Sequence, residues 1–308
     1  MFKKLALIMA LVLVLAPVSS ALAIIYYSGG AATDSWDDSA NWNLARVPTT
    51  TDLVATRGLH GSTSNVTDVD TTNCVGSTLV NGYGTPAIMP SGPAHTLNVL
   101  NGGTLTLSSA LQNACNSGAA TGYAVGTINV YDGGKIDVGA YFNLTHPNGN
   151  PASSENGGHG TLNMNGGLID VTQGFYVSRN TAGNHYGEAH MDGGELYAAS
   201  LYMGLHGTDP PDEEWVRNTI PDSMDFSGGV MYIKGDVQTQ VEGYIDNGWI
   251  TAYDGGGVVR IETDVNITSD PNAGNGLYTK IYGEIPEPGT MLLAGFGALL
   301  LLVTRRKR

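Results

Sequence analysis

Histidines and carboxylates are the side chains of this 308-residue chain that could do chemistry, and the histidines favour no particular reaction. None has the close spacing typical of zinc ligands; the seven are His60, His95, His146, His159, His185, His190 and His206. Stacked repeats could bring His185, His190 and His206 together, but solvated histidines on polar surfaces are the simpler interpretation. We therefore predict no metal site.

Carboxylates recur at similar intervals, as at Asp137, Asp170 and Asp192. A glycoside hydrolase needs two carboxylates about 5 to 9 Å apart, and a polysaccharide lyase needs a base beside cations that hold an acidic sugar. A solvated strand face gives the same recurrence, and the sequence has no Ser-His-Asp signature or phosphate-binding loop. We predict no catalytic residues and no cofactor, and keep a lyase or hydrolase as the alternative.

The densest acidic run, residues 209–214, offers oxygen atoms of the kind that bind Ca²⁺. It lacks the spacing of an EF-hand or of a calcium-binding roll, so we interpret it as a solvated loop and leave Ca²⁺ open. Cys74 and Cys115 allow one disulfide in an oxidising compartment. Two separate buried thiols fit the sequence equally well.

The charge of the chain excludes one class of partner. Its formal net charge is −14, and six of its 14 basic residues lie in the first four and last four positions. The remaining body is strongly acidic and repels phosphate backbones, so we expect no nucleic acid to bind.

A repeat dominates the body. Gly-Gly pairs begin at residues 102, 133, 166, 193, 228 and 255, and apolar residues alternate with polar ones on both sides of the first five. Such alternation predicts strands with one buried face, and Asn-Gly-Gly or Asp-Gly-Gly supplies the positive φ of a sharp corner. A third short strand follows several copies, as at residues 141–144 and 175–177.

One such unit cannot bury its apolar face, whereas stacked units can. The pattern therefore predicts an all-β fold, a right-handed parallel β-helix or related β-solenoid of roughly six to eight coils; an antiparallel β-sandwich is the alternative. We divide the chain into a signal peptide (1–23), an N-terminal cap with first coils (24–95), the Gly-Gly solenoid (96–284) and a terminal sorting segment (285–308).

Finer features of the repeat give further predictions. Apolar residues lie three and five positions before the first two Gly-Gly pairs but two and four before the next three, so a bulge or a different corner must separate the two sets. Residues 145–160, 179–187 and 205–222 are polar and should be loops at one edge of the stack. Residues 249–281 could form a last coil or a closing cap.

Aromatic residues suggest two further roles. Trp36 and Trp42 could close the end of the core, as terminal repeats require, or form a glycan-stacking platform. With Val47-Pro48 and Asp52-Leu53-Val54, they resemble the opening of exported β-solenoid proteins of the autotransporter type, although Arg46 stands where a glycine is frequent. Among 15 tyrosines, four lie near repeat strands and could form a flat outward ladder that binds glycans: Tyr131, Tyr197, Tyr202 and Tyr232.

The N-terminus has the three parts of a secretory signal peptide. Lys3 and Lys4 precede the apolar run 5–18, and Ala21-Leu22-Ala23 forms a small-x-small cleavage site. We predict cleavage after Ala23.

The C-terminus has a Pro-Glu-Pro motif, an apolar run and a basic end. Pro286, Glu287 and Pro288 precede the apolar run 291–303, and Arg305, Arg306, Lys307 and Arg308 follow it. The run is short for a permanent span, and its basic end should stay on the cytoplasmic side. The whole tail resembles the PEP-CTERM sorting signal, which implies a transient inner-membrane anchor and processing by an exosortase-type transpeptidase.

Together these features predict an exported structural or adhesive β-solenoid at the cell surface, in the outer envelope or outside the cell, associated with extracellular polysaccharide. A non-catalytic glycan-binding module is a further alternative.

Overall fold

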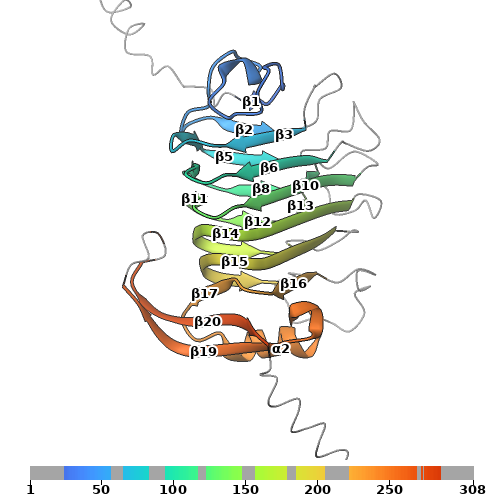
Figure 1. Cartoon of the computed structure of the whole chain (residues 1–308), viewed down its shortest axis with the longest axis vertical. Helices are drawn as coiled ribbons and strands as arrows, with labels where there is room; N and C mark the ends of the chain where they lie inside the picture. Colours follow the sequence, from blue (N-terminus) through green and yellow to red (C-terminus); the bar gives the residue numbers. More distant parts are fainter. Residues whose placement is uncertain are drawn as a thin grey trace, which may run out of the picture.

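The computed structural model describes residues 24–56, 65–82, 94–116, 123–147, 157–178, 185–204, 222–268, 272 and 274–285. Its strands stack as a β-solenoid of about five turns (Figure 1). This confirms the predicted solenoid and rules out the antiparallel sandwich, because successive coils pair in parallel. The predicted count of six to eight coils is too high, since the sixth Gly-Gly pair lies in a 3-10 turn outside the stack.

The strands form three faces along the solenoid, and the central coils give one strand or strand segment to each face. The first face contains β3 (Val66–Val69), β6 (His95–Val99), β10 (Tyr123–Val130), the beginnings of β14 (Gly157–Tyr176) and β15 (His185–Tyr202), β16 (Ser223–Phe226) and β18 (Ile250–Ala252). The second contains β4 (Cys74–Gly76), β7 (Thr104–Leu107), β11 (Lys135–Val138), the middles of β14 and β15, and β17 (Val230–Lys234). The third contains β1 (Ile24–Tyr26), β2 (Leu53–Thr56), β5 (Thr78–Asn81), β8 (Leu111–Asn113), β12 (Phe142–Asn143) and the ends of β14 and β15. A small outer pair joins β9 (Cys115–Asn116) and β13 (His146–Pro147).

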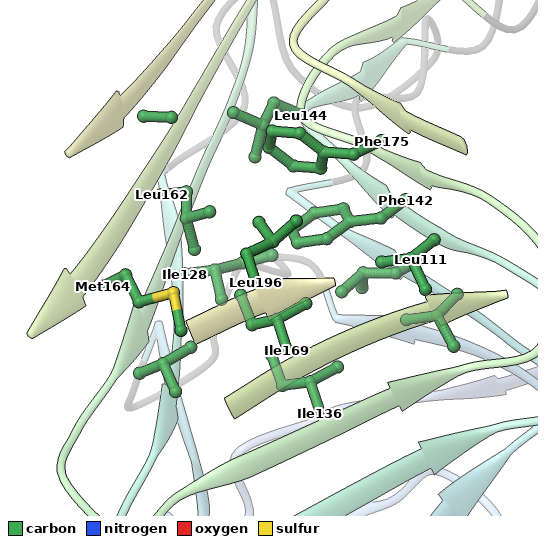
Figure 2. Close-up of a cluster of buried hydrophobic side chains, with 14 of the residues drawn as sticks. Leu111, Ile128, Ile136, Phe142, Leu144, Leu162, Met164, Ile169, Phe175 and Leu196 are labelled. Atoms are coloured by element: carbon green, nitrogen blue, oxygen red, sulfur yellow. The ribbon is translucent and has the colours of Figure 1, made fainter. Parts of the chain in front are cut away.

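The core is a continuous column of inward side chains (Figure 2). Aligned residues occupy the same level from coil to coil: Phe142 packs on Phe175, with ring centroids 5.1 Å apart. Each fully buried Leu, Ile or Phe side chain contributes about 1.5–3 kcal/mol relative to an exposed one. Stacking therefore supplies the burial that a single coil lacks.

The corner after the first face changes along the stack, as predicted. Val130 aligns with Met164 and Lys135 with Leu168, so the corner shortens from four residues (131–134) to three (165–167). Positive φ moves with it, from the first glycine of the pair at Gly133 (74°) to the second at Gly167 (70°). The shorter corner keeps the apolar residues of both flanking strands in the core.

The N-terminal end is closed by aromatic side chains. Trp36 and Trp42 are 0% and 2% exposed, their ring centroids lie 4.9 Å apart, and Trp42 Nε1 donates to the Trp36 carbonyl (2.8 Å). The 3-10 turn η1 (Ser39–Asn41) carries the chain between them. The cap interpretation is thus confirmed and the glycan-platform interpretation is wrong, because neither ring has a face in solvent.

An ion pair ties down the loop that leads into β2. Arg46 donates to both carboxylate oxygens of Asp52 (2.6 and 2.7 Å), and Thr49 donates to the same group through its amide and its hydroxyl. These bonds hold the pKa of Asp52 well below its usual range. Arg46 therefore has a structural role at a position where a glycine was expected.

The C-terminal end both continues and closes the stack. Helix α2 (Gln238–Asp246) follows β17, and β18 then adds a parallel strand to the first face. After the turn η2 (Tyr253–Gly255), β19 (Val258–Ile267) and β20 (Gly276–Glu284) form an antiparallel hairpin whose β20 pairs with β17 (Figure 1). Residues 249–281 are thus a partial coil followed by a cap.

Candidate functional site

The folded body fills the interval between the two predicted processing segments. β1 starts at Ile24, directly after the predicted cleavage site, and β20 ends at Glu284. The signal residues Ala21 and Ala23 lie outside the described residues, as does the whole sorting motif, from Pro286, Glu287 and Pro288 to Arg305, Arg306, Lys307 and Arg308. Within the described part of the chain, no helix has the length and apolar character needed to cross a membrane.

The structure brings some of the predicted tyrosines together. On the third face Tyr176 stacks on Tyr202 (centroids 4.6 Å apart, planes at 17°), and on the second face Tyr197 stacks on Tyr232 (4.7 Å, 10°). Tyr131 lies instead at the four-residue corner, 39% exposed.

This arrangement changes the interpretation of the tyrosine ladder. Residues aligned on neighbouring strands stack along the solenoid axis, so Tyr176 and Tyr202 turn their ring faces toward each other. A glycan laid across the sheet would meet ring edges and hydroxyl groups, whereas sugar stacking needs an open ring face. The tyrosines therefore form coil-to-coil contacts and not the flat platform that the sequence suggested.

A polar ladder on the outside of the first face was missed in the sequence. Asn98 donates to Asp68 (2.9 Å), Asn129 to Asn98 (2.8 Å) and Asn163 to Asn129 (2.8 Å). A row of threonine hydroxyls lies beside this ladder, because Thr96, Thr127 and Thr161 are aligned in the same three coils. The signal was present as Thr-x-Asn in the strand before each of the first three Gly-Gly pairs.

Buried ionisable residues end a row of glycines at the corner between the third and first faces. Gly126, Gly160 and Gly187 are aligned there, His95 precedes them in register and Asp222 follows. Burial lowers the pKa of His95 to about 3 and raises the pKa of Asp222 to about 6. Asp222 accepts from the amides of Gly187 (2.9 Å) and Gly204 (2.7 Å), so its carboxylate joins two coils.

The recurring carboxylates do not form one site. Asp137 and Asp170 are neighbours in register on the second face, where Lys135 pairs with Asp137 (3.0 Å), but Asp170 is fully buried. Asp192 is exposed at the three-residue corner of another coil. Because Asp170 is buried, it cannot supply the second carboxylate that glycoside hydrolysis would require.

Most other candidate ligands are dispersed or lie outside the described residues. His159 pairs with Glu188 (3.2 Å) on the first face, while His60, His206 and the acidic run 209–214 fall outside the described ranges. Among the described residues, no three His, Cys, Asp or Glu side chains are grouped as metal ligands would be. Most residues of the predicted loops 145–160, 179–187 and 205–222 also lie outside these ranges.

The two cysteines are separate. Cys74 and Cys115 are both buried free thiols, on the second face and beside the third, so the structure has the thiol alternative and not the disulfide. Burial raises the pKa of each thiol to about 12, which makes both poor nucleophiles.

Comparison with known proteins identifies the tail alone. The family described as "PEP-CTERM protein-sorting motif" matches residues 284–308. No curated protein and no solved structure gives a significant match to the chain. The match begins at the last residue of β20, so the recognised signal and the folded body are adjacent. The resemblance of the Trp36 to Val54 segment to autotransporter-type proteins stays a prediction.

Proposed function

We propose that this chain is an exported, non-enzymatic structural or adhesive protein, processed by an exosortase-type enzyme and displayed at the cell surface in association with extracellular polysaccharide. The observation that carries the proposal is the sorting motif at residues 284–308, placed directly after a solenoid that ends at Glu284. A membrane-embedded processing enzyme would act only a few residues from the folded body. That body would then remain as the exported product.

The surface chemistry supports an extracellular structural role. The acidic composition disfavours binding to phosphate backbones and anionic lipid, and both ends of the solenoid carry caps that cover the core. A capped rod of stacked coils offers long, regular faces to a polymer. These features suit a spacer or an adhesive element in a polysaccharide matrix.

Intact-mass measurement on protein from fractionated native cells tests the sorting step. We expect a product outside the inner membrane that lacks residues 1–23 and the residues beyond the Pro-Glu-Pro motif. Replacing Pro286, Glu287 and Pro288 by alanine should leave the tail in place and the protein in the inner membrane. As a matched control, Pro210→Ala/Pro211→Ala should be processed normally. A wild-type product that keeps its tail in the inner membrane contradicts the proposal.

An enzyme is the second candidate, and the structure gives it little support. Asp137 and Asp170 are neighbours in register and Lys135 pairs with Asp137, but Asp170 is fully buried and cannot act as the second carboxylate of a hydrolase. Release of reducing ends or unsaturated sugars from neutral and acidic polysaccharides is the test. Turnover by the wild type that is lost in Asp137→Asn and Asp170→Asn would favour the enzyme; we expect no turnover.

A further inference from the structure

The outside of the first face carries a regular array of uncharged polar groups. Thr96 and Asn98, Thr127 and Asn129, and Thr161 and Asn163 occupy equivalent positions on β6, β10 and β14. All six side chains are partly exposed. Asp68 flanks this array on the N-terminal side, and Glu188 and His190 flank it on the C-terminal side. Three successive coils thus present the same pair of side chains between charged neighbours.

The hydrogen bonds within the array leave capacity for a ligand. In the amide ladder Asn129 donates one N–H to Asn98 and accepts one bond from Asn163, which leaves its second N–H and one oxygen lone pair. Within the described part of the chain, the hydroxyls of Thr96 and Thr127 have no side-chain hydrogen bond, while the Thr161 hydroxyl lies 3.3 Å from His159 Nε2. Each coil therefore offers donors and acceptors in fixed positions.

The geometry of the sheet sets the spacing of these groups. Equivalent residues on neighbouring strands lie about 4.8 Å apart, and Thr and Asn two positions apart in one strand lie about 6.6 Å apart. An extended chain of hexopyranose sugars advances by a similar step per sugar and carries hydroxyls along both edges. A chain parallel to the solenoid axis could thus place one sugar on each coil.

We propose that this Thr/Asn array binds an extended, uncharged polysaccharide along the solenoid axis, about one sugar per coil. The inference rests on the proposed association with extracellular polysaccharide and specifies its surface and ligand class. Asp68, Glu188 and the acidic body disfavour a uronate polymer, because its carboxylates would meet carboxylates at the flanks.

Substitutions at the threonines can distinguish a role of the array in binding from a role in stability. The Asn ladder stabilises the stack whether or not a ligand binds, so an Asn substitution would confound stability with binding. Thr→Val removes the hydroxyl, keeps a β-branched side chain and retains the strand preference. Thr106 on β7 points outward from the second face and serves as the matched control.

The experiment uses the mature protein, which is the product of both processing steps. It measures binding of this protein to insoluble cellulose and to cellohexaose, with alginate as the acidic polysaccharide for comparison. Thr127→Val/Thr161→Val should lower affinity for the neutral probes on the order of tenfold, because two hydrogen bonds are lost. Thr106→Val should bind like the wild type. Circular dichroism checks the fold of each variant, and the single variant Thr96→Val gives a second reading if the double variant is poorly folded.

The outcomes separate the inference from the proposed function. Binding to the neutral probes that Thr127→Val/Thr161→Val and Thr96→Val leave unchanged overturns the Thr/Asn array and leaves polysaccharide association standing. Preference for alginate likewise overturns the uncharged ligand. If the wild type binds none of the three probes, both the array and this form of polysaccharide association fail, while sorting is judged by its own test.

Discussion

The glycine row at the corner between the third and first faces makes a sharp prediction. A Cβ added to Gly160 would lie 1.7 Å from the carbonyl oxygen of Leu144, where ordinary contacts begin at 3.4 Å. Gly126 and Gly187 are aligned with it and have similar limits, 2.1 Å to Asn113 Oδ1 and 2.0 Å to the Val177 carbonyl oxygen. Gly160→Ala must therefore move the backbone of one coil relative to the next.

The expected cost follows from the kind of atom in the way. Overpacking a core usually costs about 1–3 kcal/mol because side chains can adjust. At Gly160 the obstacle is a backbone carbonyl held in the stack, so we expect about 3 kcal/mol or more. For a protein of this size each 1 kcal/mol shifts Tm by about 2–4 °C, which gives a decrease of about 6–12 °C.

Thermal unfolding followed by circular dichroism measures this decrease, and Gly243→Ala is the matched control. Gly243 lies inside α2, and a Cβ there has no atom within 4 Å. Because alanine favours a helix more than glycine does, the free energy of unfolding of Gly243→Ala should increase by up to about 1 kcal/mol. If Gly160→Ala unfolds within 2 °C of the wild type, the close approach of the two coils in the structure is wrong.

Three further predictions concern buried charge. The fold favours neutral His95, because burial lowers its pKa from 6.5 to about 3. Its contribution to the free energy of unfolding is therefore complete above pH 6.5 and is lost as the pH falls toward 3. In denaturant titrations, His95→Gln should weaken this pH dependence. The pH dependence due to Asp222 has the opposite direction, because burial raises its pKa from 3.8 to about 6 and the free energy of unfolding falls as the pH rises through that interval. Asp222→Asn should remove this fall in the same titrations and lower the free energy of unfolding by about 1 kcal/mol, because one hydrogen-bond acceptor is lost. Arg46→Ala leaves the Asp52 side chain, only 4% exposed, without its cation and should lower the midpoint of denaturant unfolding. An equal decrease in Arg46→Lys would show that the bidentate geometry matters.

Much of the fold could be predicted because stacking repeats one rule many times. Alternation around Gly-Gly indicated which residues face the core, and the one-residue change in offset predicted a bulge or a different corner. The structure has a shorter corner, with positive φ at Gly167 where the longer corner has it at Gly133. The buried pair Trp36 and Trp42 followed from the need to close an apolar column. In each case a local pattern determines burial directly.

Other features depend on register across coils, which local patterns leave open. Thr-x-Asn recurs before the first three Gly-Gly pairs, but its recurrence alone does not show that the side chains form one outer array. The alignment of His95 with Gly126 likewise depends on register across coils, so neither the Thr/Asn array nor the glycine row was predicted. Alternation in residues 258–267 indicates a strand but gives no direction, and the antiparallel pairing of β19 was left undecided for that reason. The prediction of a flat tyrosine ladder was wrong about the orientation of the rings. Period-two spacing indicates the face of the solenoid on which a ring lies, but not the direction of the ring plane.

The two capped ends set a limit on what the protein can build. An uncapped solenoid exposes strand edges and core at both ends and can grow by stacking copies end to end. Here Trp36 and Trp42 cover one end, and the antiparallel hairpin β19–β20 interrupts parallel addition at the other. The rod therefore has a fixed length of about five strand spacings, roughly 24 Å, and its sorting tail leaves from the hairpin end. The polysaccharide that we propose as a ligand would then contact the sides of the rod, which is where the Thr/Asn array lies.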